Sequence, residues 1–531
     1  MLEKIVVVGG GISGLISATL LAKKGIKVTL IEKNEVCGGL VNSFNKDGFI
    51  FDVGIRAIEN AGMIIPMINE LGIDLDLLQS KVSLGIENEV IHTEKEDSIN
   101  DYELLLEHMY PESTDDVKKV IQVIKDFNVY MKVLFGDESP FYKDKKKDRK
   151  YYFTTFFGWL FKFMKTGIAI TKMKNPVEDF LHNLISNDSL FDIISQHFFK
   201  KTPAFFAMSY FSLYSDYYYP KGGVGQLAQK IEEKFVELGG NKMLNSEISQ
   251  LDLKSKLLFD KLGNSYSYDK LIWCADLKKL YDLIDLDQVP KKIVQKVRTE
   301  KKQILSSKGA ESVFSIYCAV NENPEFFQNI SDGHFFYTPL KQGLGSLHRE
   351  DLSQMLNSWK RGNKDQVLTW LNDFCKFNTF EISLPVLNDP DAAPKGQTGL
   401  IVSFLMEYEL VENINKDGWY EEFKTYVENL VIGILSDTIY PGIKEKVIFK
   451  NSLSPLSVKK RVGSSEGAIV GWSFENSVPI SAGVINMNKA ILTTLPDIYK
   501  AGQWTVSPAG LPTCIMTAKM ACDKVLKDLG K

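Results

Sequence analysis

The chain has 531 residues, of which 44% are hydrophobic and 24% charged, so it is a folded globular protein rather than a disordered or collagen-like one. Its 63 basic and 67 acidic residues give a net charge of −4, which offers no overall basicity for nucleic-acid binding. The six cysteines form no C-x-x-C pair and the six histidines no H-E-x-x-H pattern, so we expect neither a disulfide framework nor a metal site.

The N-terminal apolar run is too short for a targeting segment. It covers residues 5–8 and stops at Gly9, with no cleavage-site pattern behind it. No stretch of 18 or more uncharged apolar residues occurs along the chain. We therefore expect a cytoplasmic protein of two or three structural units.

The first secondary-structure elements predict a dinucleotide-binding unit. A β-branched run at residues 5–8 is typical of a buried parallel strand. The pattern G-x-G-x-x-G follows at residues 9–14, and a helix is expected over residues 15–24. A second strand over residues 26–31 ends at Glu32.

Each glycine and acidic residue of that unit has a physical role. Gly9 permits the tight turn, Gly11 lets the backbone approach a pyrophosphate, and Gly14 lets the helix pack on the strand. The helix N-terminus then presents free N–H groups to the phosphates. Glu32 follows Gly14 by 18 residues, close to the usual spacing of about 20, and its carboxylate favours FAD or NAD over NADP. We assign the neighbouring residues Ile12, Ser13 and Lys33 to the same site.

The following residues favour FAD. The segments 37–43 (CGGLVNS) and 48–54 (GFIFDVG) resemble the extended signature of the FAD-dependent amine oxidase and phytoene desaturase superfamily. The resemblance implies that Gly38, Gly39 and Leu40 pass beside the FAD diphosphate. It also implies that Gly54 and Ile55 approach the isoalloxazine ring.

Two later blocks match the same superfamily in the family order. The first runs from Tyr219 through a helix to Leu238 and two strands, at residues 248–251 and 267–275. The resemblance implies that Ile248 lies on the adenine side of FAD and that Ala275 borders the cofactor. The second block is a strand entering Gly502–Gln503, followed by a helix over residues 513–529 that would aim its N-terminal amides at the flavin. In that block the resemblance implies cofactor contacts for Gly502, Gln503, Gly510, Leu511 and Pro512.

These blocks predict an α/β fold whose FAD-binding domain is discontinuous. It is Rossmann-like, of the glutathione reductase type, and consists of residues 1–90, 216–280 and 451–531. Residues 91–215 are expected to form a helical cap, and residues 281–450 the rest of a substrate domain with an antiparallel sheet. A second G-x-G-x-x-G is absent from the sequence, so we do not expect a separate nicotinamide domain.

Segments 384–404 and 454–472 resemble the branch of phytoene desaturases, carotenoid isomerases and retinol saturases. That resemblance implies an FAD-dependent oxidoreductase that desaturates or saturates carbon–carbon double bonds of a long apolar substrate, such as a carotenoid, a retinoid or a similar lipid. One alternative is a redox-neutral isomerase of such a polyene. The other is a non-catalytic prenyl- or lipid-binding protein on the same fold. The sequence does not indicate the electron donor or acceptor.

A flavin moves hydride, so the protein has to position the substrate and manage a proton. The candidate proton donors are Arg56, Glu59, His334 and Glu407. We favour Arg56 as the catalytic residue because it follows Gly54 closely. For His334 and Glu407 a structural charge is the preferred interpretation.

Residues 143–174 hold ten Lys or Arg and two Asp, a local charge of +8, and eight aromatic residues lie within 151–164. Basic residues beside aromatic ones are typical of an interfacial membrane helix, which predicts peripheral attachment to the inner face of a membrane. The alternative is a helical cap whose aromatic face is core. The positive charge is local, so a nucleic-acid partner is not expected.

Overall fold

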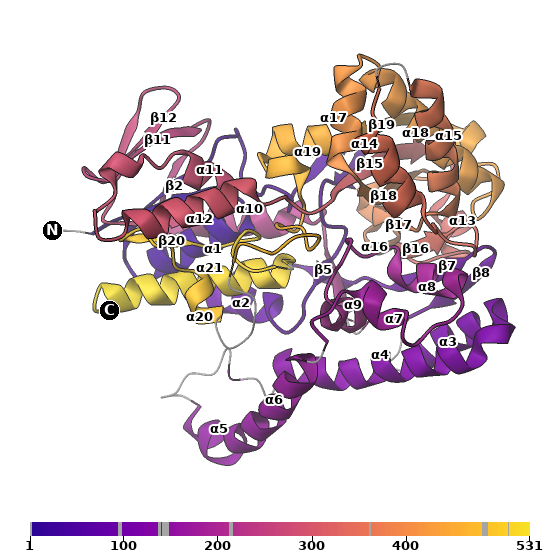
Figure 1. Cartoon of the computed structure of the whole chain (residues 1–531), viewed down its shortest axis with the longest axis horizontal. Helices are drawn as coiled ribbons and strands as arrows, with labels where there is room; N and C mark the ends of the chain where they lie inside the picture. The colour runs from indigo at the N-terminus through magenta and orange to yellow at the C-terminus, as the bar shows by residue number, and fades with distance from the viewer. Residues whose placement is uncertain are drawn as a thin grey trace.

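The computed structural model describes residues 3–93, 98–135, 140, 148–171, 173–211, 216–360, 363–480, 487–507 and 509–531. Two β-sheets lie side by side, each with its own helices, and both chain termini lie at the end of the molecule formed by the first sheet (Figure 1). Among the described residues, none of the helices combines the length and apolarity that a membrane span requires.

The first sheet is parallel and has the strand order β10-β2-β1-β14-β20. Its strands are β10 (Asn241–Met243), β2 (Lys27–Ile31), β1 (Lys4–Val8), β14 (Lys270–Trp273) and β20 (Ile498–Lys500). They come from three distant parts of the chain, which confirms the discontinuous α/β domain.

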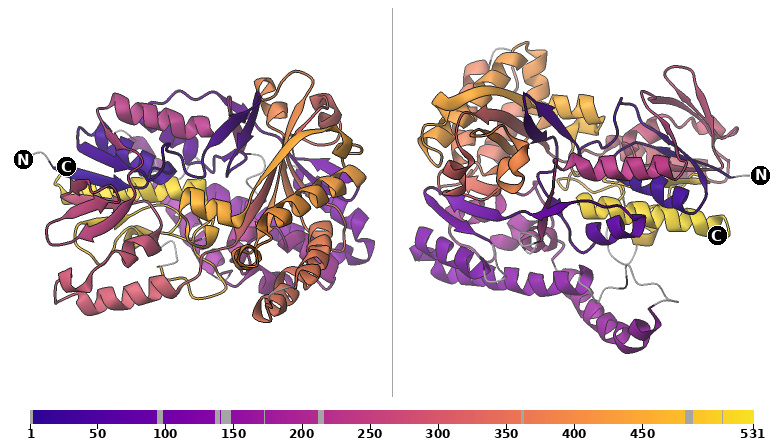
Figure 2. Two further views of the ribbon diagram at one scale, coloured as in Figure 1. Left: turned by 90° about the horizontal axis from the view of Figure 1, so that it is seen from above. Right: turned by 180° about the vertical axis from the view of Figure 1, so that it is seen from behind.

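Alternation along β1 explains why helices cover both sides of this sheet (Figure 2). Ile5 and Val7 pack in one core with α1 (Ile12–Lys23), α10 (Gly225–Glu237) and α21 (Leu511–Asp528). Val6 and Val8 pack in another core with α11 (Leu277–Asp282) and α12 (Val294–Ser306). A strand that buries both faces reads as a continuous apolar run, as residues 5–8 do.

The second sheet has the order β19-β15-β18-β17-β16-β7-β8. Its strands are β19 (Val447–Leu453), β15 (Ser312–Val320), β18 (Thr398–Met406), β17 (Phe380–Ser383), β16 (His334–Thr338), β7 (Val82–Ile86) and β8 (Glu89–His92). All neighbours are antiparallel except β16 and β7, which pair in parallel. The strands β7 and β8 therefore belong to this sheet, although the sequence division placed residues 1–90 in the first domain.

One face of the second sheet packs against α15 (Lys364–Phe377), α17 (Tyr408–Lys416) and α18 (Tyr420–Asp437). The opposite face packs partly on the hairpin of β3 (Ser43–Lys46) and β4 (Phe49–Asp52), through contacts of Phe49 and Phe51 with Tyr317 and Ile401. The residues of β15, β16, β17 and β18 that point to this opposite face can therefore reach the space between the two sheets.

Small elements complete the frame. The short strands are β5 (Ile58–Glu59), β6 (Leu77–Gln79), β9 (Tyr217–Pro220), β11 (Ile248–Asp252), β12 (Leu257–Asp260) and β13 (Ser265–Ser267). The remaining helices outside the cap are α2 (Ile64–Leu71), α13 (Pro324–Gln328), α14 (Leu352–Asn357), α16 (Pro385–Asn388), α19 (Pro455–Val462) and α20 (Met487–Ala490).

A helical cap lies beside the second sheet. It consists of α3 (Ser98–Met109), α4 (Thr114–Phe135), α5 (Arg149–Thr154), α6 (Phe156–Thr171), α7 (Val177–Leu181), α8 (Asp188–Ser195) and α9 (Ala204–Tyr210). The long helix α4 runs along one edge of the molecule, and α5 and α6 extend beyond it, away from the second sheet (Figures 1 and 2).

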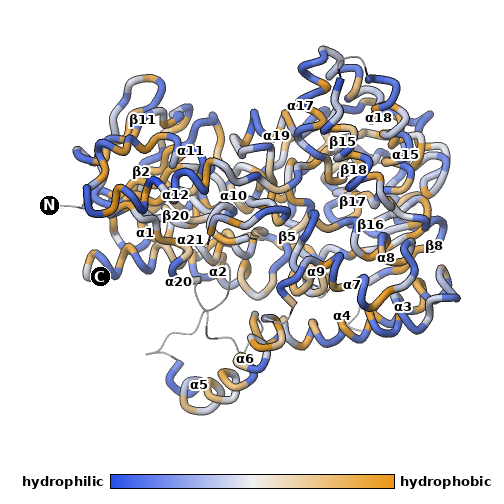
Figure 3. Tube along the Cα trace, in the orientation of Figure 1, coloured by the Kyte–Doolittle hydropathy of each residue, from blue (hydrophilic) through white to orange (hydrophobic). Residues whose placement is uncertain are grey.

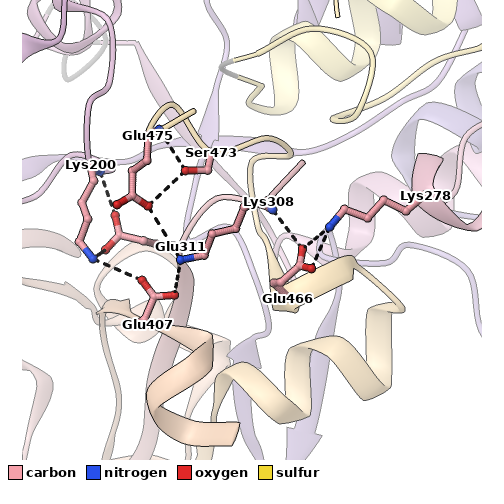
Figure 4. Close-up of polar contacts among 9 residues, drawn as sticks. Lys200, Lys278, Lys308, Glu311, Glu407, Glu466, Ser473 and Glu475 are labelled. Carbon is pink, nitrogen blue, oxygen red and sulfur yellow. Dashed lines mark hydrogen bonds and ion pairs between the residues drawn. The ribbon is translucent and has the colours of Figure 1, made fainter. Parts of the chain in front are cut away.

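An ion cluster joins the cap, the second sheet and the C-terminal part of the chain (Figure 4). The Nζ atom of Lys200 lies 3.3 Å from a carboxylate oxygen of Glu407 and 3.5 Å from one of Glu311. Lys308 lies 3.0 Å from the other oxygen of Glu407 and 3.9 Å from Glu475. We name these five residues the interdomain cluster.

Candidate functional site

A cavity of about 720 Å³ runs from the carboxyl ends of β1, β2 and β14 to the face of the second sheet. Ligands of open α/β sheets bind at this edge of the strands. Most residues that the sequence assigned to a cofactor line it: Gly9, Gly11, Ile12, Ser13, Glu32, Lys33, Gly38, Gly39, Leu40, Gly54, Ile55, Ile248, Ala275, Gly502, Gln503, Gly510 and Leu511. Gly14 and Pro512 are not among the lining residues. Their direct cofactor contact, like that of the lining residues, stays a prediction.

The glycine loop before α1 has the geometry that its spacing predicts. Gly9 has a φ of +104°, which side-chain-bearing residues rarely adopt. A Cβ atom at Gly14 would lie 1.8 Å from the carbonyl oxygen of Gly9, so Gly14 permits the close packing of helix on strand. A Cβ atom at Gly11 would meet nothing within 4 Å, because that position borders the cavity.

The second glycine pair lies directly against this loop. The N–H of Gly38 donates to the carbonyl of Gly10 at 2.8 Å, and Gly11 and Gly38 form a parallel bridge. Within the described residues, α1 has no side-chain cap at its N-terminus. Its first amides and positive dipole end therefore remain available to an anionic group such as a diphosphate.

Glu32 is fixed at the end of β2 by backbone donors. Its Oε2 accepts from the N–H of Gly10 at 2.6 Å, and its Oε1 accepts from the N–H of Asn34 at 2.9 Å. The carboxylate is buried and borders the cavity. It therefore both holds the glycine loop and offers acceptors for hydroxyl groups of a bound ribose.

The C-terminal helix α21 begins two residues earlier than the sequence pattern indicates, at Leu511. Pro512 fits because proline is tolerated in the first turn of a helix. The N–H of Gly502 donates to Thr517 Oγ1 at 3.0 Å, and Ser13 Oγ donates to the carbonyl of Cys514 at 3.2 Å. The bond from Ser13 joins α21 to α1, and the bond from Gly502 joins α21 to the turn after β20, with the start of α21 on the cavity.

Arg56 lines the cavity but is occupied by structural bonds. Its Nη2 donates to Ser315 Oγ at 2.9 Å and Ser403 Oγ at 2.6 Å, and its Nη1 donates to the carbonyl of Asp52. A guanidinium stays protonated at every accessible pH, so it is a poor proton donor. These contacts favour a role in tying the segment after Gly54 to β15 and β18, and the catalytic role expected for Arg56 remains an untested prediction.

The far part of the cavity is mainly aromatic and apolar. Its lining there includes Phe198, Phe199, Phe206, Val313, Phe336, Phe404 and Leu405. His197 also lines it, and burial lowers the pKa of His197 to about 4, which makes its ring neutral. An elongated apolar molecule fits such a lining, since few of these side chains require a polar partner.

Five polar side chains converge in the same part of the cavity: Glu59, Tyr210, Tyr217, His334 and Glu381. Sequence reasoning considered Glu59 and His334 but gave no role to Glu381. The available signal in the sequence was the alternation of apolar and polar residues at 380–383 (FEIS), which is typical of a strand. The pairing of β16 with β17 then brings His334 and Glu381 to one face of the sheet. Glu407, another sequence candidate, does not line the cavity and belongs to the interdomain cluster.

The described residues contain no cluster of three or more His, Cys, Asp and Glu side chains that could hold a metal ion.

Comparisons with known proteins match the chain over nearly its whole length. The sequence profile of the flavin-containing amine oxidoreductases matches residues 12–526. An all-trans-retinol 13,14-reductase from Danio rerio is 23% identical, with 94% of this chain and 82% of that protein covered. A 4,4'-diapophytoene desaturase (4,4'-diaponeurosporene-forming) from Staphylococcus aureus is 21% identical, with 99% of each chain covered.

Solved structures show the same fold. The crystal structure of an oxidoreductase from Methanosarcina mazei aligns with a TM-score of 0.63 at 14% identity, covering 98% of this chain and all of that one. This likeness shows a shared fold and does not by itself assign an activity.

Proposed function

The chain belongs to the family of flavin-containing amine oxidoreductases and uses FAD, and we propose that it desaturates or saturates carbon–carbon double bonds of a long apolar lipid. Carotenoids, retinoids and similar polyenes are the expected substrate class. The observation that carries the proposal is the cavity, which continues from the glycine loops into an aromatic, apolar chamber. The two relatives named for a retinol reductase and a diapophytoene desaturase support the same class of substrate.

The residues of the glycine loops are suited to hold FAD. The open position at Gly11, the adjacent Gly38 and Gly39 and the uncapped α1 N-terminus leave room and donors for a diphosphate. Glu32 is placed to accept from the ribose. When bound, FAD accepts or supplies a hydride, while the protein orients the substrate and excludes water.

Lipid conversion tests the proposal. The purified FAD-loaded protein is incubated with all-trans-retinol, with 4,4'-diapophytoene and with a total lipid extract. Each incubation is carried out once with the oxidised and once with the reduced protein, and the products are analysed by mass spectrometry. We expect one lipid to lose two hydrogens with the oxidised protein or to gain two with the reduced protein.

The alternatives give different products. A redox-neutral double-bond isomerase would change the chromatographic retention of a lipid and leave its mass unchanged. A non-catalytic lipid-binding protein would retain a lipid unaltered in both redox states. Failure of both redox states to alter any lipid, while FAD is bound, would contradict an enzymatic role.

Nicotinamide nucleotides should bind weakly to the FAD-loaded protein. The sequence holds a single G-x-G-x-x-G loop, and we assign that loop to FAD. Calorimetric titration with NADH and with NADPH should give dissociation constants above the micromolar range. Micromolar affinity for either nucleotide would reveal a second dinucleotide site.

We also propose that α5 and α6 attach the protein to an anionic membrane surface, on the inner, cytoplasmic face. The exposed apolar residues of α6 recur every three or four positions, so they share one helix face, and Phe153 of α5 is exposed as well. Phe153, Phe157, Phe161, Met164 and Ile168 are between 59% and 83% exposed. We name these five residues the apolar stripe. The interpretation of the aromatic face as core therefore applies only to the other side of the helix.

That other side packs on the cap. Trp159 is buried, and its Nε1 donates to the carbonyl of Val133 in α4 at 2.8 Å. The rings of Trp159 and Phe163 are stacked at 4.9 Å. Figure 3 shows α6 as an apolar stretch at the margin of the molecule, where a bilayer could reach the stripe.

Basic residues flank the apolar stripe. Arg149, Lys150, Lys162 and Lys165 are exposed, and the remaining basic residues at 143–147 lie outside the described part of the chain. Cations beside apolar side chains suit the interface of an anionic bilayer, each worth about 1 kcal/mol near the surface. A lipid-soluble substrate gives such attachment a purpose, since the substrate resides in the bilayer.

Replacement of two stripe residues should release the protein from liposomes. Burial of a phenylalanine is worth about 1.5–3 kcal/mol, so Phe157→Ser/Phe161→Ser should weaken partitioning about 100-fold or more. Sedimentation with anionic and with neutral liposomes measures the effect. Salt should weaken the binding of the wild type to anionic liposomes only in part, because screening acts on the charges and not on the apolar contacts.

The control replaces exposed apolar residues elsewhere. Val236 and Leu262 are also well exposed, outside α5 and α6, so Val236→Ser/Leu262→Ser should bind liposomes like the wild type. Equal sedimentation of the stripe variant and the wild type would contradict a membrane role for α5 and α6.

A further inference from the structure

Glu59 is a carboxyl group placed inside the apolar part of the cavity. It ends the short strand β5, which pairs with β9 through Glu59 and Tyr217. It lies five residues beyond Gly54, and both residues line the same cavity. A carboxyl among aromatic side chains needs a partner or a function, because an unpaired charge is costly there.

Two tyrosines hold this carboxyl in place. The hydroxyl of Tyr217 donates to Glu59 Oε1 at 3.0 Å, and that of Tyr210 donates to the same oxygen at 3.2 Å. The two hydroxyl oxygens are themselves 3.0 Å apart. Within the described residues, no hydrogen bond reaches Oε2, so the tyrosines orient the group and leave its second oxygen for another molecule.

The pKa of a second carboxyl of the cavity, that of Glu381, is shifted in the opposite direction. Glu381 Oε1 lies 3.2 Å from His334 Nε2, without the alignment of a hydrogen bond. Burial would raise the pKa of Glu381, but His334 and the charge of Arg56 outweigh it and hold this pKa below its usual range.

Burial raises the pKa of Glu59 above its ordinary value, although both tyrosine hydrogen bonds and His334 act against that shift, while the charge of Glu381 adds to it. The groups facing Glu59 are thus Tyr210 of α9, Tyr217 of β9, His334 of β16 and Glu381 of β17. Two carboxyls whose pKa values are driven apart mark an acid and a base. The raised pKa of Glu59 is the direction that an acid requires.

We propose that Glu59 is the catalytic residue that exchanges a proton with the substrate, an inference that rests on the proposed function. In the reducing direction, the π bond of the substrate breaks as one carbon receives hydride from reduced flavin. The O–H bond of Glu59 breaks, and its proton forms a C–H bond at the neighbouring carbon. The resulting carboxylate is stabilised by the hydroxyls of Tyr210 and Tyr217. In the oxidising direction the Glu59 carboxylate removes that proton while the neighbouring carbon yields hydride to oxidised flavin.

The direct test is the protonation state of Glu59. The infrared spectrum of FAD-loaded Glu59→Gln is subtracted from that of the FAD-loaded wild type. At neutral pH the difference should contain the band of a protonated carboxyl group, and this band should disappear as pH rises. In Tyr217→Phe the band should persist to higher pH, because one donor that stabilises the carboxylate is lost. Glu381→Gln is the matched control, and the protonated band should survive in it. Absence of the band from the difference spectrum at neutral pH would overturn the proposal.

Turnover supplies the second readout. With the lipid that the wild type converts, Glu59→Gln should keep its FAD and its folded circular dichroism but lose at least about 100-fold in the single-turnover rate, the usual size of general acid–base effects. In the reducing direction, the wild-type rate should fall as pH rises through the pKa of Glu59, and Tyr217→Phe should shift that fall upward. A rate within threefold of the wild type would overturn the assignment. If the wild type converts no lipid, the proposed function fails, and the infrared titration still decides whether Glu59 is an acid.

Discussion

Glu32→Arg protein is expected to bind FAD about 100-fold or more weakly than the wild type. The substitution replaces acceptors by donors at the site of the ribose, and a hydrogen bond to a charged group contributes about 1.5–3 kcal/mol. It also removes the acceptor for the N–H of Gly10, 2.6 Å away, so the glycine loop loses an anchor. Flavin content after purification, and titration of FAD into the stripped protein, measure the effect.

The control for this change is Glu35→Arg. Glu35 lies three residues further on and is exposed, so the same reversal of charge occurs without contact to the loop. It should bind FAD like the wild type. A Glu32→Arg protein that retains full flavin content would show that Glu32 does not contact the cofactor.

The first part of the fold could be predicted because its signals are local. The strand at residues 5–8, the glycine loop, the helix and Glu32 all lie within about thirty residues, and each is specified by its neighbours in sequence. The β-branched run at residues 5–8 predicted a parallel strand, the resemblance of the later blocks implied a discontinuous domain, and the structure confirms both.

The second sheet was less accessible from the sequence. The strand β7 pairs in parallel with β16, about 250 residues later, and neither segment carries a signal for the other. The polar groups of the cavity depend on such pairings. Glu381 faces His334 because of the register of β17 on β16, and Glu59 meets Tyr217 because β5 pairs with β9. Nearness to Gly54 in the sequence therefore drew attention to Arg56, whose structural bonds come from two distant strands.

The basic aromatic segment illustrates a third limit. Composition identified it, but the division into a buried side with Trp159 and an exposed side with Phe157 depends on where α4 lies. Periodicity gives the faces of a helix, and only packing decides which face is covered.

The interdomain cluster depends in the same way on contacts between distant segments. Lys200 and Glu407 are 207 residues apart, and both side chains are largely buried. Burial would lower the pKa of Lys200, but Glu311 and Glu407 outweigh it and raise that pKa. Burial would raise the pKa of Glu407, but Lys200 and Lys308 hold it below its ordinary value. Burial raises the pKa of Glu311, against the attraction of Lys200.

Lys200→Met is therefore expected to lower the free energy of unfolding by about 3–5 kcal/mol at neutral pH, the range for removal of one partner of a buried ion pair. The loss arises because Glu311 and Glu407 keep their burial and lose the cation that they share, which leaves Glu407 with Lys308 alone. Urea denaturation measures it. Lys230→Met is the control, because Lys230 pairs with Glu233 on the surface at 3.0 Å, and such pairs contribute about 1 kcal/mol or less.

The loss of unfolding free energy in Lys200→Met should depend on pH, whereas a simple loss of packing would not. In the wild type, Glu407 has a lowered folded pKa, so its stabilisation is present above its unfolded pKa of about 4.3 and disappears as pH falls through the folded value. In Lys200→Met the folded pKa values of Glu407 and Glu311 should rise, which makes their ionised forms a cost above the unfolded pKa. Lowering the pH towards 4 removes that cost by protonation. The difference in unfolding free energy between the wild type and Lys200→Met should therefore be largest at pH 7–8 and shrink towards pH 4, and a constant difference across that range would contradict the ionic origin of the effect.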